Sequence, residues 1–95
     1  MKYELPVDYT KLTAAQRKEV RNQYIVEQNN LCIFCGCALN IPPPKSVTEK
    51  YIDWSLFPPG FLKYPIHLQH HHKTNLTEGA CHNYCNAVAF QYYGR

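Results

Sequence analysis

The sequence lacks the features that would place the chain in a membrane or export it. No apolar run approaches the roughly 20 residues that a membrane-spanning helix needs. Residues 1–6 contain no apolar stretch of the kind found in signal peptides. Long charged or low-complexity tracts are also absent, and hydrophobic residues make up 45% of the chain, which argues against disorder. We therefore expect a soluble, globular, cytoplasmic protein that does not bind membranes.

The chain is also short, and its excess of positive charge is small. With 95 residues it has room for a single domain with a small core. Ten basic and seven acidic residues give a formal net charge of +3. This balance permits binding to nucleic acid without requiring it, because dedicated binders often carry a denser basic stripe.

Cysteine, in contrast, is abundant and is placed in a pattern. The chain has five cysteines, an odd number, and no export signal, so a secreted disulfide framework is disfavoured. Cys32 and Cys35 form one close pair, and Cys81 and Cys85 form another after a long interval. Two such pairs are typical of a structural zinc site. All the histidines lie between His67 and Cys85, which indicates further metal and proton chemistry there.

The first half of the chain predicts an arm, a helix and a zinc knuckle. Residues 1–12 lack periodicity, and Thr13 with Gln16 has the form of a capping box that opens a helix over residues 13–28. Val20, Tyr24 and Leu31 are expected to share its buried face. Residues 32–37 follow as a Cys-x-x-Cys-Gly knuckle, in which the thiol of Cys37 points away and is spare.

Basic residues of the predicted helix allow two interpretations. Arg17 and Arg21 lie four residues apart, with Lys18 beside them. They form either a solvated face or a ridge that follows phosphates, since the arginine fork suits phosphate oxygens.

Residues 41–65 form a segment rich in proline and aromatic residues, in which regular helix and sheet interior are disfavoured. Its aromatic side chains either pack on the core or contact substrate by stacking on unpaired bases. Beyond it, residues 66–70 alternate like a strand, residues 76–79 are expected to return as a second strand, and a helix is expected over residues 83–93.

Two stretches near the C-terminus carry a specific pattern. They read His67-Leu68-Gln69-His70-His71-His72-Lys73-Thr74-Asn75 and Glu78-Gly79-Ala80-Cys81-His82-Asn83-Tyr84-Cys85-Asn86. Together with the upstream Cys-x-x-Cys they resemble the HNH nucleases, and most of all the phage recombination endonuclease VII group. That group reads Asp-His-Asp-His-Lys-Thr-Gly and then Arg-Gly-Leu-Leu-Cys-x-x-Cys-Asn.

The resemblance implies a single HNH nuclease domain over residues 1–95. Its fold would be a small α+β fold, with a ββα-metal (His-Me finger) motif over residues 66–93 behind the helix and the zinc knuckle. The implied activity is hydrolysis of DNA phosphodiester bonds, with a structural Zn²⁺ and a catalytic divalent ion (Mg²⁺, Mn²⁺ or Ni²⁺), in a bacterial or phage-infected host. The alternative is a catalytically silent zinc module that only binds nucleic acid.

Site residues follow from the same resemblance. His70 matches the general base, Asn86 matches the asparagine of the catalytic helix, and His72 matches a histidine that holds the catalytic loop. The structural zinc ligands that the resemblance implies are Cys32, Cys35, His82 and Cys85, with Cys81 as the rival fourth ligand. The resemblance implies double-stranded DNA as the partner. The residues expected to contact it are Arg17, Lys18, Arg21 and Lys73.

One position departs from the pattern. Gln69 stands where the family has its metal-binding aspartate, and an amide lacks the charge that makes carboxylate a strong Mg²⁺ ligand. Gln69 and Asn86 then bind the ion weakly, or neighbouring imidazoles such as that of His71 favour Mn²⁺ or Ni²⁺. In a third arrangement the register slips by one residue, so that His70 becomes the ligand and His71 the base.

Overall fold

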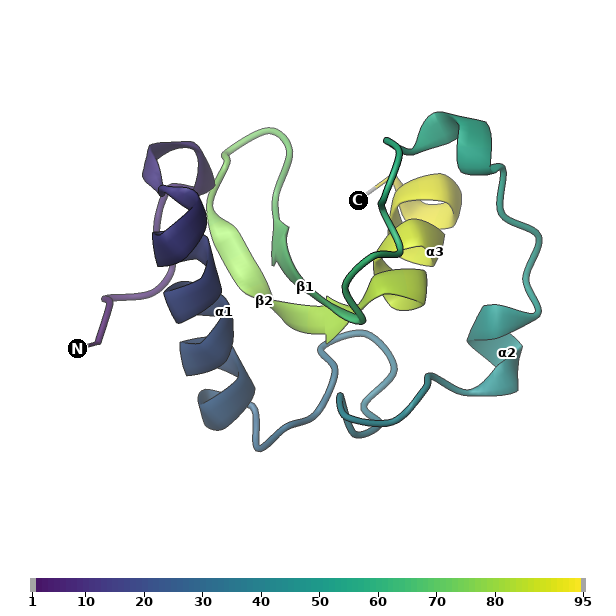
Figure 1. The fold of residues 1–95 in the computed structure, drawn as a ribbon, viewed down its shortest axis with the longest axis horizontal. Helices are drawn as coiled ribbons and strands as arrows, with labels where there is room; N and C mark the ends of the chain where they lie inside the picture. The colour runs from purple at the N-terminus through teal and green to yellow at the C-terminus, as the bar shows by residue number, and fades with distance from the viewer. Residues whose placement is uncertain (1, 95) are drawn as a thin grey trace.

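A computed structural model describes residues 2–94, which form a small α+β fold (Figure 1). A two-stranded antiparallel sheet lies between α1 on one side and α3 with the 41–65 segment on the other. The elements in chain order are η1 (Tyr9–Lys11), α1 (Ala14–Glu27), α2 (Lys45–Thr48), η2 (Trp54–Leu56), β1 (Ile66–His70), β2 (Thr77–His82) and α3 (Asn83–Tyr93). No helix of this described part is both long enough and apolar enough to cross a membrane.

The capping box fixes the start of α1, as predicted. The Thr13 side chain accepts a hydrogen bond from the backbone N–H of Gln16 at 3.2 Å, and the Gln16 side chain accepts one from the backbone N–H of Thr13 at 2.9 Å. The predicted buried face is correct for Val20, which is fully buried. It is wrong for Leu31, which is 44% exposed because the helix has already ended at Glu27.

The second strand is longer than the sequence predicted. It continues past Gly79 to His82, and it pairs with β1 through Leu68 opposite Ala80 and His67 opposite Cys81. Burial explains the extension, because Gly79, Ala80 and Cys81 are all buried, so the backbone needs the hydrogen bonds of a strand. The last strand residue, His82, is also the N-cap of α3, and this helix has the predicted bounds.

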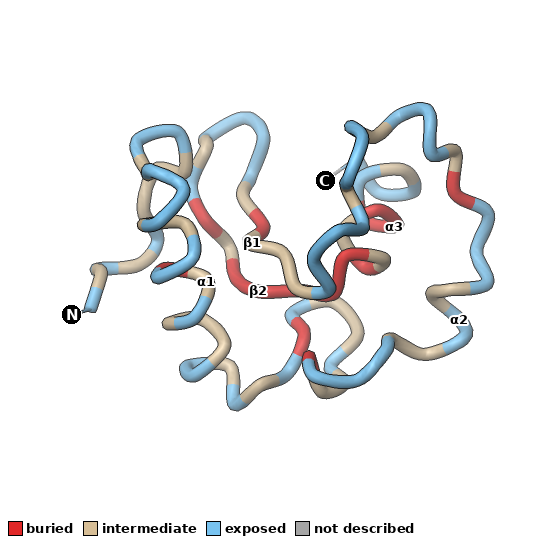
Figure 2. The backbone as a smooth tube through the Cα atoms, in the orientation of Figure 1, coloured by how far each residue is buried: buried red, intermediate tan, exposed pale blue. Residues whose placement is uncertain are grey.

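The buried residues concentrate on β2, the start of α3 and the knuckle (Figure 2). One cluster contains Cys32, Leu39, Ala80, Cys81 and Cys85. A second cluster contains Ile52, Ala87 and Val88, with Phe57 and Phe61 packed against it.

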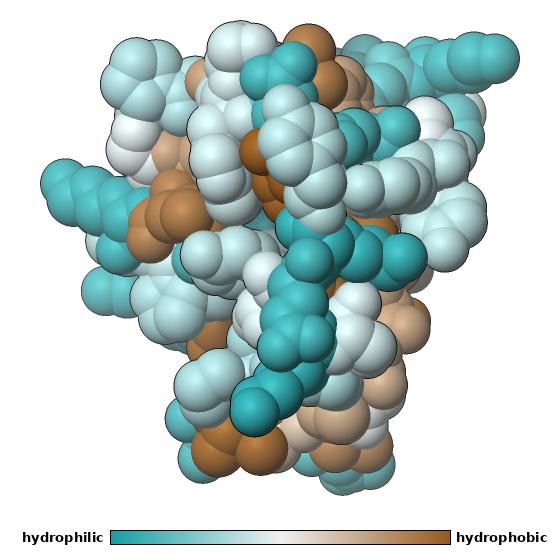
Figure 3. All heavy atoms as spheres, turned by 90° about the vertical axis from the view of Figure 1, so that its right-hand side faces the viewer, coloured by the Kyte–Doolittle hydropathy of each residue, from teal (hydrophilic) through white to brown (hydrophobic). Residues whose placement is uncertain are grey.

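The 41–65 segment is mostly irregular, but besides the 3-10 turn η2 it contains one α-helical turn that its prolines did not predict. This turn, α2, begins directly after Pro44, a position at which proline does not interrupt helical hydrogen bonds. Phe57 and Phe61 of the segment pack on the core, as one of the two interpretations expected, and both also line a surface cleft. On the face that carries α2, hydrophobic atoms lie in separate patches among hydrophilic ones (Figure 3).

The N-terminal arm is docked on the tip of the hairpin. Val7 accepts a hydrogen bond from the backbone N–H of Thr77 at 2.9 Å, and the backbone N–H of Tyr9 donates to the carbonyl of Asn75 at 2.7 Å. A segment with no periodicity in sequence therefore acquires a fixed position, which brings the Tyr9 ring next to β1.

Gly79→Ala is expected to destabilise the domain by about 3 kcal/mol, because the added Cβ would clash with its neighbours and the backbone conformation would be strained. A Cβ at this position would lie 2.7 Å from Gln28 Oε1 and 2.7 Å from Ile33 Cγ2, and the backbone φ is +152°. Urea unfolding of the zinc-loaded protein measures the change. The control is Gly60→Ala, where φ is +77° but no atom lies within 4 Å. An equal loss in both variants would show that the close approach to α1 and the knuckle is not what requires glycine.

Candidate functional site

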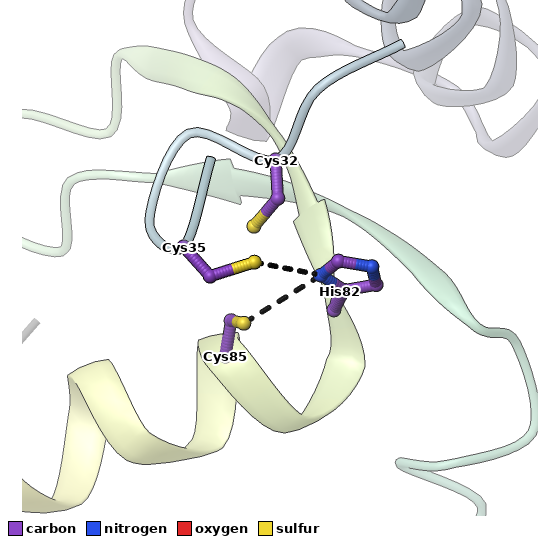
Figure 4. A group of neighbouring side chains, drawn as sticks. All are labelled: Cys32, Cys35, His82 and Cys85. Atoms are coloured by element: carbon purple, nitrogen blue, oxygen red, sulfur yellow. Dashed lines mark hydrogen bonds between the residues drawn. The ribbon is translucent and has the colours of Figure 1, made fainter. Parts of the chain in front are cut away.

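Four side chains converge at the junction of the knuckle, β2 and α3 (Figure 4). Cys32 and Cys35 come from the knuckle, His82 ends β2, and Cys85 lies in the first turn of α3. Their ligand atoms all lie within 4.8 Å of one another. His82 Nδ1 is 3.4 Å from Cys35 Sγ and 3.6 Å from Cys85 Sγ. Tetrahedral zinc bonds to nitrogen and sulfur place these atoms about 3.6 Å apart, so the group fits a Cys3His zinc site.

The imidazole of His82 is held in the orientation that a metal ligand needs. Its Nε2 lies 2.9 Å from the carbonyl oxygens of both Ala38 and Ile41. A carbonyl only accepts, so Nε2 carries the proton and Nδ1 keeps its lone pair, which faces the thiols. The ring is 2% exposed and well enclosed.

The rival ligand Cys81 is not a member of the four-residue group among the described residues. Its side chain is fully buried in the apolar cluster beside the sheet, and burial raises the pKa of its thiol. Cys37 is likewise outside the group, and its thiol lies 3.8 Å from the carbonyl of Cys35. The predicted set with His82 as fourth ligand is therefore the one that converges.

The thiols of the group share their protons unequally. A hydrogen bond from the Cys85 thiol lowers the pKa of Cys32 to about 4, and the same pair interaction raises the pKa of Cys85. The protein therefore favours the thiolate form of Cys32 even without a bound metal ion. A bound dication favours the deprotonated form of the remaining thiols, which couples metal binding to proton release.

A separate cleft of about 870 Å³ opens between α1, the 41–65 segment, β1 and α3. Arg17, Lys18 and Arg21 of α1 line one wall, and aromatic and proline residues between 56 and 64 line another. Five polar side chains that line it from β1, the residues after it and α3 are His67, Gln69, His70, His72 and Asn86. None of the described residues that line the cleft is acidic.

His70 is stacked against the N-terminal arm. Its ring lies 4.0 Å from the ring of Tyr9, with an interplanar angle of 14°. The guanidinium of Arg17 also packs on the Tyr9 ring, 4.4 Å from its centroid. The His72 ring is 4.9 Å from His70. Burial, followed by the nearby His72 and Arg17, lowers the pKa of His70, so the imidazole is neutral and can accept a proton at neutral pH.

His67 contacts Asn86 directly. Its Nδ1 lies 3.0 Å from the side-chain amide nitrogen of Asn86, and the edge of Phe61 packs against its ring with centroids 4.7 Å apart. Burial, opposed in part by the carbonyls of Phe61 and Tyr64, lowers the pKa of His67.

Of the remaining predicted site residues, Gln69 also lines the cleft, whereas His71 and Lys73 do not. Gln69 is 2% exposed, and its amide nitrogen donates to the carbonyl of His70 at 3.0 Å and lies 3.5 Å from Glu78 Oε1. His71 is exposed outside the cleft lining, and its Nδ1 accepts hydrogen bonds from the backbone N–H groups of Lys73 and Thr74 at 3.1 and 3.3 Å. Lys73 is exposed at this turn and also lies outside the cleft lining.

Sequence reasoning missed two residues of the cleft, His67 and Tyr9. Strand alternation contained a signal for His67, because it lies two residues before Gln69 and so faces the same side of β1 in a regular strand. No local signal exists for Tyr9, because its position depends on a backbone hydrogen bond to Asn75, which lies 66 residues later in the sequence.

Comparison of the chain with protein-family models, with curated proteins and with solved structures gave no significant match.

Proposed function

We propose that this protein is a metal-dependent endonuclease that hydrolyses DNA phosphodiester bonds, with His70 as the general base. The observation that carries the proposal is the composition of the cleft. A neutral imidazole, the amide of Asn86 and two arginines face one space, which is the combination that phosphodiester hydrolysis needs. The order of hairpin and helix, with zinc ligands at their junction, also agrees with a ββα-metal motif.

The two arginines favour a phosphate ligand. Among the described residues, the buried side-chain nitrogen and oxygen atoms that have no hydrogen-bond partner are Nε of Arg17 and Nε of Arg21. Such unsatisfied donors are costly unless a ligand supplies an acceptor. Both residues line the cleft, and phosphate oxygens are acceptors that match the arginine fork.

The cleft residues fit some divalent ions better than others. The described lining offers imidazole nitrogens and amide oxygens and no carboxylate, a donor set that suits Mn²⁺ or Ni²⁺ and is poor for Mg²⁺. Asn86 and a histidine beside it would hold the ion. When bound, the ion stabilises the charge that develops on the phosphate and on the leaving oxygen.

The protein's own groups carry the other parts of the reaction. The lone pair of His70 takes a proton from water, and the resulting hydroxide attacks phosphorus in line with the leaving 3′-oxygen. Tyr9 holds the plane of the His70 ring by stacking on it. Arg17 and Arg21 bind the phosphates that flank the cut. By the resemblance to HNH nucleases, the products carry 5′-phosphate and 3′-hydroxyl ends.

A nicking assay on supercoiled plasmid tests the proposal. The zinc-loaded protein is incubated with Mn²⁺, with Ni²⁺, with Mg²⁺ and with no added ion. Open-circle DNA should appear with Mn²⁺ or Ni²⁺ and should be absent without an added ion. Retarded plasmid with no nicking under any ion would favour the alternative, a zinc-stabilised module that binds nucleic acid without cutting it.

The double change Arg17→Gln and Arg21→Gln should weaken binding to a DNA duplex by about tenfold or more at 0.1 M salt. The slope of log affinity against log salt should become shallower by about 2, because each lost phosphate contact removes about 0.9. Fluorescence anisotropy with a labelled duplex measures both quantities. The control is Lys45→Gln, which removes an exposed charge outside the cleft lining. An equal loss in the control would mean that the cleft is not where DNA binds.

A further inference from the structure

We propose that His67 and Asn86 together bind the catalytic divalent ion, and that the His67 imidazole takes the ligand role that Gln69 does not fill. This inference rests on the proposed function for the purpose of the ion, but the binding itself can be measured without any DNA cleavage.

The first support is the position of the two side-chain ends. His67 Nδ1 lies 3.0 Å from the amide nitrogen of Asn86, although the residues belong to different elements, β1 and α3. Two ligand atoms at right angles around an ion, with bonds of about 2.1 Å, are about 3.0 Å apart. A half-turn of the amide exchanges its nitrogen for its oxygen, so Asn86 Oδ1 and His67 Nδ1 are spaced as neighbouring ligands.

The second support is the environment of the His67 ring. The ring is half-buried, and the edge of Phe61 packs against it with centroids 4.7 Å apart, which holds its plane. The amide nitrogen of Asn86, which can only donate, lies 3.0 Å from Nδ1. The proton of the neutral ring is therefore on Nε2, and the lone pair of Nδ1 points to the proposed ion.

The third support is the way in which Gln69 is used. Its side chain is buried, and its amide nitrogen is bonded to the carbonyl of His70 within the hairpin. Gln69 also lines the cleft, but its side chain is 2% exposed, whereas His67 is half-buried and its Nδ1 lies 3.0 Å from the side chain of Asn86.

An imidazole and an amide form a neutral ligand pair, and this determines the class of ion. Imidazole suits Mn²⁺ and Ni²⁺, whereas Mg²⁺ depends on carboxylate oxygens. Three basic side chains, those of Arg17, Lys18 and Arg21, line the same cleft. Their positive charges oppose a cation until phosphate oxygens are present, so the free protein should bind the ion only weakly.

Electron paramagnetic resonance of Mn²⁺ tests the inference directly. Mn²⁺ is titrated into the zinc-loaded protein, and the loss of the free six-line signal gives the dissociation constant. Mn²⁺ does not displace zinc from a thiolate site, because it stands at the weak end of the divalent series. We expect one weak site, whose affinity falls at least tenfold in His67→Ala and in Asn86→Ala, and which is unchanged in His71→Ala.

Electron spin-echo modulation of the bound Mn²⁺ provides a second readout that does not depend on affinity. A directly bonded imidazole nitrogen should be visible in the wild type and in Gln69→Ala, and should be absent in His67→Ala. Zinc content and circular dichroism establish that each variant is folded. Loss of the site in Gln69→Ala with retention in His67→Ala would overturn the inference, and so would the absence of any Mn²⁺ site in the folded wild type. Neither result depends on nicking, so a site without cleavage would contradict only the proposed function.

Discussion

Removal of zinc is expected to unfold the domain, not merely to inactivate it. Structural zinc contributes about 10–16 kcal/mol of apparent binding free energy, which is comparable with the whole stability of about 5–15 kcal/mol typical of a folded domain. The reason lies in the size of the cores: the two buried clusters contain eight residues, and Cys32 and Cys85 of the first also belong to the four-residue group that fits zinc. Treatment with a strong chelator should abolish the far-ultraviolet helical signal, and added Zn²⁺ should restore it.

Two substitutions separate the zinc effect from the loss of core packing. His82→Ala should lose bound zinc and unfold, as Cys32→Ser should. Cys81→Ala removes a thiol of the same buried cluster that is outside the four-residue group, so it should keep one zinc per chain. Metal analysis of the purified variants measures this stoichiometry. Zinc loss in Cys81→Ala with retention in His82→Ala would make Cys81 the fourth ligand, and native-like dichroism after verified zinc removal would contradict the coupling altogether.

His70→Ala is expected to lower the rate of plasmid nicking by about 10²–10⁴-fold, the usual contribution of a positioned general base. Binding of DNA and zinc content should remain close to wild type, because His70 lies outside the zinc group and its contacts are ring contacts with Tyr9 and His72. Single-turnover nicking with Mn²⁺ at saturating protein measures the chemical step without the influence of binding.

His71→Ala is the matched control for this prediction. His71 accepts two backbone hydrogen bonds at the exposed turn, so its loss should cost about 1 kcal/mol of stability and less than tenfold in nicking rate. If His71→Ala removes the activity and His70→Ala only weakens the response to Mn²⁺, the register that makes His71 the base is correct.

The parts of the fold that were predicted correctly depend on short-range patterns. The capping box at Thr13 and the alternation over residues 66–70 are local, and local hydrogen bonds and burial determine them. The spacing His-x-x-Cys likewise brings His82 and Cys85 together, because the two residues sit on either side of a strand–helix junction.

The cleft could not be derived in the same way. Its walls come from segments that meet only in the folded chain: the docked arm that carries Tyr9, the helix that carries Arg17, and the irregular segment that carries Phe61. The burial of Gln69 is equally non-local: this residue lines the cleft but is 2% exposed, and its amide nitrogen donates to the carbonyl of His70. Neither fact has a signature in residue spacing.

Because α3 follows β2 without a loop, the directions in which Cys85 and Asn86 point are fixed relative to the sheet. Successive helical residues differ by about 100° around the helix axis. Cys85 therefore faces the other three residues of the Cys3His group, while Asn86, one position later, faces the cleft. One residue inserted after His82 would rotate both out of place at once, whereas an insertion beyond the last turn of α3 would leave both untouched. Because no loop lies beside this junction, an insertion or deletion there cannot be absorbed and would displace both sites.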